Sequence, residues 1–129
     1  MAYKAVSSTR IYLDLRRLLD KILDITPNFP RAYKFTVGDR MQSIAIDLIA
    51  DISAAYLNRD KSVRLVHLSR FQANFETLKM LLRIAGERRW ISGKSVHADI
   101  VELIVSIGKQ STAWLKSLTE SKTSASPGS

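Results

Sequence analysis

The sequence predicts an all-α protein that folds as an antiparallel up-down four-helix bundle. Four long segments carry apolar residues at intervals of three and four positions, which places those residues on one face of a helix. The chain has 3 prolines, two in the first connection and one close to its end, so no helix breaker interrupts these segments. No stretch alternates apolar and polar residues long enough to indicate a strand. Four amphipathic helices joined by three connections are typical of such a bundle.

The first predicted helix covers residues 8–25. Its apolar positions follow a 4, 3, 4, 3 spacing and consist of Ile11, Leu15, Leu18, Ile22 and Ile25. Ser7 or Ser8 is expected to cap its start, because a serine hydroxyl can accept a hydrogen bond from a free N–H group of the first turn. Pro27 is expected to end it, since the residue before a proline is disfavoured in helical geometry.

The second predicted helix covers residues 37–58 and follows the aromatic, basic stretch FPRAYKFTVGDRM at residues 29–41. Its stripe consists of Met41, Ile44, Leu48, Ile52 and Ala55. Thr36 and Asp39 have the T-x-x-D spacing of a capping box, in which each side chain accepts a hydrogen bond from the backbone of the other residue. The sequence therefore predicts that this stretch opens the second helix.

The third predicted helix covers residues 60–85, with Gly86 as its C-terminal cap. Its stripe consists of Phe71, Phe75, Leu78, Leu82 and Ala85. The fourth covers residues 93–118 after a capping Ser92, with a stripe of Val96, Ile100, Leu103, Ile107, Gln110 and Trp114. The expected domain organisation is then a flexible N-terminus at residues 1–7, the bundle at residues 8–118, and a small, polar, disordered tail at residues 119–129.

The second and fourth helices carry more apolar residues than one bundle core needs. The additional positions are Ile46, Ile49, Ala50, Val101, Ile104, Val105 and Leu115. A helix in a small bundle exposes about half of its girth, so these positions predict a second buried contact and hence a homo-oligomer. The alternative is that they are ordinary exposed apolar residues. Periodicity does not give the number of subunits.

Positive charge is in excess and unevenly distributed. The formal net charge is +8, which favours polyanionic partners. Residues 61–89 hold 7 basic residues against 2 acids, and residues 26–36 hold two cations and no acid. An up-down topology brings these two segments to the same end of the bundle. The predicted nucleic-acid-binding residues are Arg31, Lys34, Arg64, Arg70, Lys79, Arg83, Arg88 and Arg89.

Two aromatic residues, Tyr33 and Trp90, are expected beside the cations at that end. Lys94, at the start of the fourth helix, would join this group. Basic groups interleaved with aromatic rings suit a phosphate backbone with unstacked bases. The alternative is a solvated rim whose aromatic side chains fold back on the end of the bundle.

The sequence does not predict an enzyme, a metal site or a cofactor. It has no cysteine, and its two histidines, His67 and His97, have no second cluster of ligand types nearby. Asp47 and Asp51 lack the Glu-x-x-His partners of a di-iron bundle, so they are expected on a solvated face or in salt bridges. There is no phosphate loop or nucleophile elbow. With no apolar run of bilayer length and no secretory signal, a cytoplasmic protein without membrane contact is expected.

Three stretches carry a resemblance to a known family. The first, FPRAYKFTVGDRMQSIAIDLIADISAAY, matches at Phe29, Pro30, Tyr33, Phe35, Gly38 and Met41. The second is FQANFETLKMLLRIAGERRWIS. The third, SIGKQSTAWLKS, matches at Ile107, Gly108, Lys109, Trp114, Leu115 and Lys116, with Thr112 and Ala113 in place of a glycine pair. The chain resembles the accessory variability determinant (Avd) family of diversity-generating retroelements, four-helix-bundle proteins related to those encoded in intervening sequences of bacterial 23S ribosomal RNA genes.

This resemblance implies a homopentameric barrel of four-helix bundles that is not catalytic. It implies a basic scaffold that binds the reverse transcriptase and the template-repeat RNA and supports mutagenic complementary-DNA synthesis. Five chains at +8 each would carry about +40, a strong field for RNA. The alternative is a bundle of the intervening-sequence type, which acts as a protein-interaction module and uses its cations for solubility.

Overall fold

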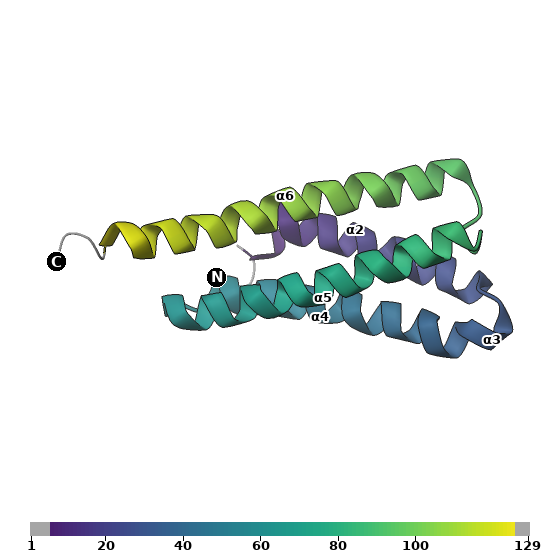
Figure 1. Cartoon of the computed structure of the whole chain (residues 1–129), viewed down its shortest axis with the longest axis horizontal. Helices are drawn as coiled ribbons and strands as arrows, with labels where there is room; N and C mark the ends of the chain where they lie inside the picture. Colours follow the sequence, from purple (N-terminus) through teal and green to yellow (C-terminus); the bar gives the residue numbers. More distant parts are fainter. Residues whose placement is uncertain (1–5, 126–129) are drawn as a thin grey trace.

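The computed structural model describes residues 6–125, and these form an antiparallel four-helix bundle without strands (Figure 1). The long helices are α2 (Arg10–Ile25), α4 (Asp39–Leu57), α5 (Lys61–Glu87) and α6 (Lys94–Ala125). Helices α2 and α5 run in one direction, and α4 and α6 run in the other. Each of α2 and α5 packs on both α4 and α6, so the core lies between four helices. The predicted fold class is confirmed.

The core is built from the apolar stripes that the sequence predicts for the first three helices, since every predicted stripe residue of α2, α4 and α5 is buried. In α6 the buried positions are Ile100, Ile107, Ser111 and Leu118. The predicted α6 positions Gln110 and Trp114 are only half-buried. The buried stripe of α6 is therefore turned by one residue relative to the prediction in its C-terminal half.

The starts of the first two helices differ from the prediction. Thr9 caps α2 in place of Ser7 or Ser8, and its Oγ1 lies 3.4 Å from the Tyr12 nitrogen, whose N–H it accepts. The predicted capping box of Thr36 and Asp39 is wrong. Thr36 Oγ1 donates to the Tyr33 carbonyl at 3.3 Å instead, because the backbone is already helical at this point.

The ends of the last two helices also differ. Gly86 lies inside α5 and does not cap it; the residue with left-handed backbone geometry is Arg89, with φ 62°. Helix α6 continues past Leu118, the predicted end, to Ala125, since no proline or glycine occurs before Pro127. Residues 1–5 and 126–129, at the ends of the predicted flexible N-terminus and tail, lie outside the described residues.

The stretch between α2 and α4 is a packed joint. A 3-10 turn (Thr26–Asn28) leads to Pro30, the short helix α3 (Arg31–Tyr33) and a π-helical turn (Lys34–Gly38) that runs directly into α4. Phe29 is buried, and the hydroxyl of Thr26 donates to the Ile22 carbonyl at 2.9 Å while accepting a bond from Gln42 at 2.7 Å. The stretch thus opens the second helix as predicted. Thr26 keeps helical geometry as the first residue of the 3-10 turn, so Pro27 does not force an extended residue before it.

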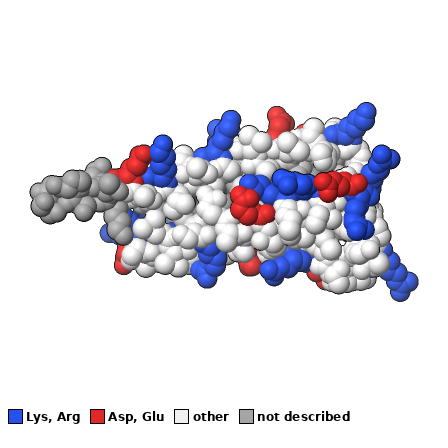
Figure 2. Space-filling model, viewed as in Figure 1, with Lys and Arg blue, Asp and Glu red and all other residues white. Residues whose placement is uncertain are grey.

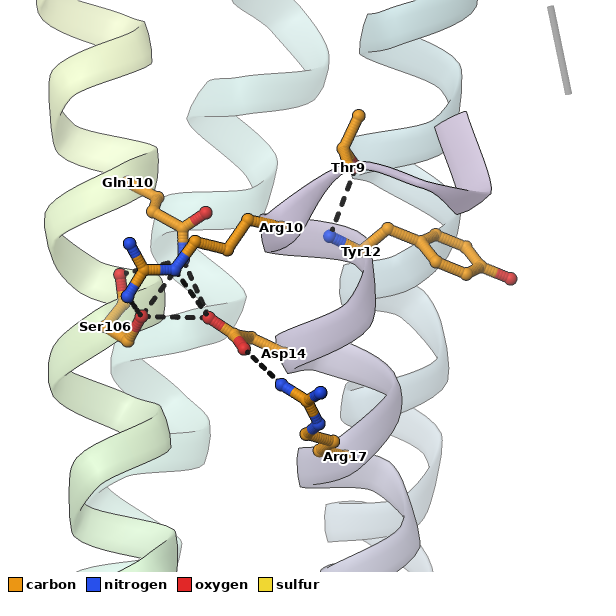
Figure 3. A network of polar contacts seen from close by, with 7 residues as sticks. All are labelled: Thr9, Arg10, Tyr12, Asp14, Arg17, Ser106 and Gln110. Atoms are coloured by element: carbon orange, nitrogen blue, oxygen red, sulfur yellow. Dashed lines mark hydrogen bonds and ion pairs between the residues drawn. The ribbon is translucent and has the colours of Figure 1, made fainter. Parts of the chain in front are cut away.

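A buried carboxylate joins α2 to α6 (Figure 3). Asp14 is 5% exposed, and it accepts hydrogen bonds from Ser106 Oγ and Gln110 Nε2, both at 2.8 Å. Arg17 on the same helix donates to its other oxygen at 3.2 Å. Four-helix bundles bury few charges, and here the neighbouring donors offset the cost of desolvation.

A second buried carboxylate joins α4 to α5. Asp51 Oδ1 lies 3.1 Å from Arg70 Nε and 3.1 Å from His67 Nδ1. The expected salt-bridge role is confirmed for Asp51, whereas Asp47 is exposed. Across residues 6–125, no helix combines the length and hydropathy needed to cross a bilayer.

Candidate nucleic-acid interface

One end of the bundle, where the α2–α4 and α5–α6 connections lie, carries a group of cations that we call the basic pole. Blue side chains gather at this end in Figure 2. Its members are Arg31, Lys34, Arg83, Arg88, Arg89 and Lys94, all exposed except the half-buried Lys34. None of these six forms an ion pair with another residue in the described part of the chain. Asp24, Asp39 and Glu87 are acids on the adjoining turns, and the six cations outnumber them.

The aromatic residues predicted for this pole are packed against one another. The Tyr33 and Trp90 rings stack with centroids 4.9 Å apart, and Phe29 lies 5.2 Å from Trp90. The Arg88 guanidinium lies over the Tyr33 and Trp90 rings, at 5.5 Å from the centroid of Tyr33 and 5.6 Å from that of Trp90. The rings therefore fold back on the bundle end, which was the alternative to open stacking surfaces. They also hold Arg88 in place through cation–π contacts.

Phe35 is the most exposed aromatic residue of the basic pole, since Tyr33 is 37% exposed. The Phe35 side chain is 67% exposed, and the Lys34 ammonium lies 5.6 Å from its ring centroid. Phe35 matches the family pattern in the sequence, but no nucleic-acid contact was predicted for it. The exposure of Phe35 could have been predicted from its position off the Met41–Ile44–Leu48 stripe, because an aromatic residue off the core stripe faces outward.

Three of the eight predicted nucleic-acid-binding residues form side-chain hydrogen bonds or ion pairs within the chain. Arg64 donates to the carbonyls of Asn58 and Tyr56 at the end of α4. Arg70 pairs with Asp51, and Lys79 pairs with Glu76 at 2.9 Å. Arg64 lies one turn after the start of α5, at the end of the bundle away from the basic pole (Figure 1). The eight residues thus do not share one surface; the structure brings together Arg31, Lys34, Arg83, Arg88 and Arg89.

The surplus apolar residues of α4 and α6 are largely open to solvent. Ile46 is 54% exposed, Val101 48% and Val105 49%. Ala50 is exposed as well, while Ile49, Ile104 and Leu115 are half-buried against the core. A shallow groove runs between α5 and α6 from Arg83 of the basic pole past Val101 and Val105, and no acid lines it.

Hydrogen bonds from the Ser62 hydroxyl and backbone N–H lower the pKa of Asp60, which caps the start of α5. Over the described residues no three His, Asp or Glu side chains are placed to hold a metal ion together.

The structure is an antiparallel helical bundle whose distinctive surface is a cationic end. The model of the bAvd-like family matches residues 5–118. This chain belongs to the bAvd-like family, which confirms the resemblance to Avd proteins, and that family is an accessory, non-catalytic one. No curated protein and no solved structure is significantly similar to the chain.

Proposed function

We propose that this protein is the non-catalytic accessory protein of a diversity-generating retroelement. In this role it binds the reverse transcriptase and the template-repeat RNA in the cytoplasm and so supports mutagenic complementary-DNA synthesis. Membership of the bAvd-like family supports the accessory role. The RNA-binding part depends on one observation, the six cations of the basic pole that have no ion-pair partner in the described part of the chain.

Cations without an acid partner suit a phosphate backbone. A Lys or Arg that already pairs with a carboxylate gains less from a phosphate, because the existing ion pair must be broken first. Each free cation that neutralises a phosphate releases counterions, so binding strengthens as salt falls. We therefore propose RNA contact for the six cations of the basic pole and not for Arg64, Arg70 and Lys79, whose charged groups already bond within the chain.

We further propose that the protein acts as a homo-oligomer, and as the pentamer that the family resemblance implies. The exposed apolar residues Ile46 of α4 and Val101 and Val105 of α6 support an association between chains, because each leaves apolar surface in contact with water. Light scattering of the purified chain, with and without RNA, measures the subunit number. A monomeric mass under both conditions would contradict this part of the proposal.

The RNA-binding test compares two triple variants with the same formal net charge. The first reverses charge at the basic pole as Arg83→Glu, Arg88→Glu and Arg89→Asp; aspartate is chosen at Arg89 because it tolerates a positive φ. The control reverses exposed cations outside the pole, as Arg59→Glu, Lys109→Glu and Lys116→Glu. Binding of each to fluorescent template RNA is measured by anisotropy across a salt series.

The pole variant is expected to bind RNA more weakly, with a salt dependence that flattens by about 0.7 to 0.9 for each lost phosphate contact. The control is expected to keep the wild-type slope. Equal losses in both variants would indicate attraction by net charge alone and would contradict the assignment to the basic pole. A wild-type chain that captures the reverse transcriptase but no RNA would instead support the protein-interaction module.

A further inference from the structure

Phe35 is more exposed than any other large apolar side chain in the described part of the chain, at 67%. It lies in the π-helical turn Lys34–Gly38. Such a turn contains more residues than an α-helical turn, so it changes the direction in which side chains leave the helix, and such turns occur frequently at functional sites. An exposed phenyl ring gains nothing from contact with water, so its position needs an explanation.

The backbone that carries Phe35 is held firmly. The N–H groups of Tyr33 and Lys34 both donate to the Pro30 carbonyl, at 2.9 and 3.0 Å. At the other end of the turn, Gly38 is buried, and a Cβ there would lie at an ordinary contact distance, 3.5 Å, from the Cβ of Thr26. The ring is thus presented on an ordered support, which lowers the entropy cost of binding to it.

The surroundings of the ring select an anionic ligand. Residues 26–40 contain three cations, Arg31, Lys34 and Arg40, and one acid, Asp39. The Lys34 ammonium lies 5.6 Å from the ring centroid, and Arg31 lies one helical turn earlier. An apolar protein surface that covered Phe35 would remove water from these charges without supplying a counter-charge, which is costly.

Single-stranded nucleic acid offers both features that this site requires. Every base has a flat apolar face, and the adjoining phosphates are anionic. An RNA duplex supplies the phosphates but keeps its base faces stacked inside. Tyr33 and Trp90 cannot take the role of Phe35, because their rings already stack on each other with Arg88 above them.

We propose that Phe35 is the stacking platform for an unpaired base of the bound RNA, with Lys34 and Arg31 on the flanking phosphates. This inference rests on the proposed RNA-binding function and deepens it. Two groups of residues at the basic pole then have different roles. Arg83, Arg88 and Arg89 contact the phosphate backbone of any RNA, whereas Phe35 distinguishes single-stranded from paired segments.

The test uses the full chain and three probes, which are a single-stranded oligoribonucleotide, a blunt RNA duplex and an inorganic polyphosphate. Phe35→Ala and Phe35→Leu both remove the aromatic face, and leucine keeps an apolar side chain. Phe35→Trp keeps the aromatic face. Leu57→Ala is the matched control, because Leu57 is a large exposed apolar residue at the opposite end of the bundle.

We expect Phe35→Ala and Phe35→Leu to weaken single-strand binding by about 5- to 150-fold, which corresponds to the loss of one stacked base. Binding to the duplex and to polyphosphate should not change, and the slope of the salt dependence should stay at its wild-type value. Phe35→Trp and Leu57→Ala should bind all three probes as the wild type does. In addition, a 4-thiouridine oligonucleotide should crosslink under ultraviolet light to the peptide that contains Phe35.

Several results would overturn the inference. Wild-type single-strand binding by Phe35→Ala, with RNA binding otherwise intact, refutes the stacking role alone. The same result accompanied by loss of reverse transcriptase capture, or by a changed oligomer mass, shows that Phe35 contacts protein. If the wild-type chain binds none of the three probes at low salt, the proposed RNA-binding function fails as well, so the two failures are distinguishable.

Discussion

Replacing Asp14 tests how the bundle holds α6 against α2. The carboxylate accepts two hydrogen bonds of 2.8 Å across the helix pair, and hydrogen bonds to a charged group contribute about 1.5 to 3 kcal/mol each. Arg10 and Arg17 also approach it, but their side chains are 78% and 66% exposed, so each ion pair adds less than about 1 kcal/mol. Removing the acid also relieves its desolvation and strands no buried charge. We therefore expect Asp14→Ala to lower the free energy of unfolding by about 2 to 3 kcal/mol.

The opposite deletion should be more damaging. Replacing Ser106 and Gln110 by alanine leaves the buried Asp14 carboxylate with only the exposed arginines, and a buried charged group that loses its hydrogen bonds costs more than about 3 kcal/mol. Adding Asp14→Ala to that double variant should recover part of the stability. Such a rescue is the signature of an interaction that acts as a unit.

Urea unfolding followed by circular dichroism, at one fixed protein concentration, gives these free energies. The matched control is Asp20→Ala on the exposed side of the same helix, which should change stability by less than about 0.5 kcal/mol. If Asp14→Ala costs no more than Asp20→Ala, or if the three substitutions add without rescue, the carboxylate does not couple α2 to α6 as described.

Three further predictions concern other parts of the chain. Gly108→Ala should raise the free energy of unfolding by about 0.5 to 1 kcal/mol, because the added Cβ would meet Phe75 at an ordinary 3.5 Å; a loss of stability in urea would contradict this spacing. Arg64→Ala should lower stability by about 1 kcal/mol, since Arg64 bonds the last carbonyls of α4, and it should leave the salt slope of RNA binding unchanged, whereas Arg83→Ala should reduce that slope. Asp60→Ala should destabilise the protein at neutral pH. Because Ser62 lowers the pKa of Asp60 in the folded state, the stability due to the ionised cap is present above its ordinary pKa of 3.8 and is lost as the pH falls through the lowered value. The penalty in paired urea titrations should therefore shrink on acidification, and a penalty independent of pH would contradict the charged cap.

The fold was predictable because the apolar stripes of α2, α4 and α5 follow helical periodicity closely. The end of α5 and the core face of α6 were harder to predict from the sequence. Arg89 takes the left-handed conformation although Gly86 is close by, because α5 continues for one more residue after the glycine. In α6 a buried serine, Ser111, lies on the core face in place of the predicted Gln110, whereas the predicted Trp114 packs against the core while half-buried. A hydropathy pattern does not assign Ser111 to the core, since serine scores as polar.

The candidate site was predictable in its position but not in its membership. The up-down topology alone brings Arg31 and Arg88 to one pole. Whether a given cation is available depends on contacts across helices, such as that of Arg70 with Asp51, and on local partners such as Glu76 for Lys79. Likewise, the mutual stacking of Tyr33 and Trp90, which leaves Phe35 as the exposed ring, requires knowledge of how the two connections meet.

The two buried aspartates also restrict how the helices can be arranged. Asp14 finds its donors only if α6 lies beside α2 at one height, and Asp51 finds Arg70 and His67 only if α5 lies beside α4 in the same way. A slide of one helix by a turn, or a bundle wound with the opposite hand, would place a carboxylate in an apolar seam. Helices with entirely apolar contact faces could tolerate such shifts, whereas these two buried polar interactions disfavour them.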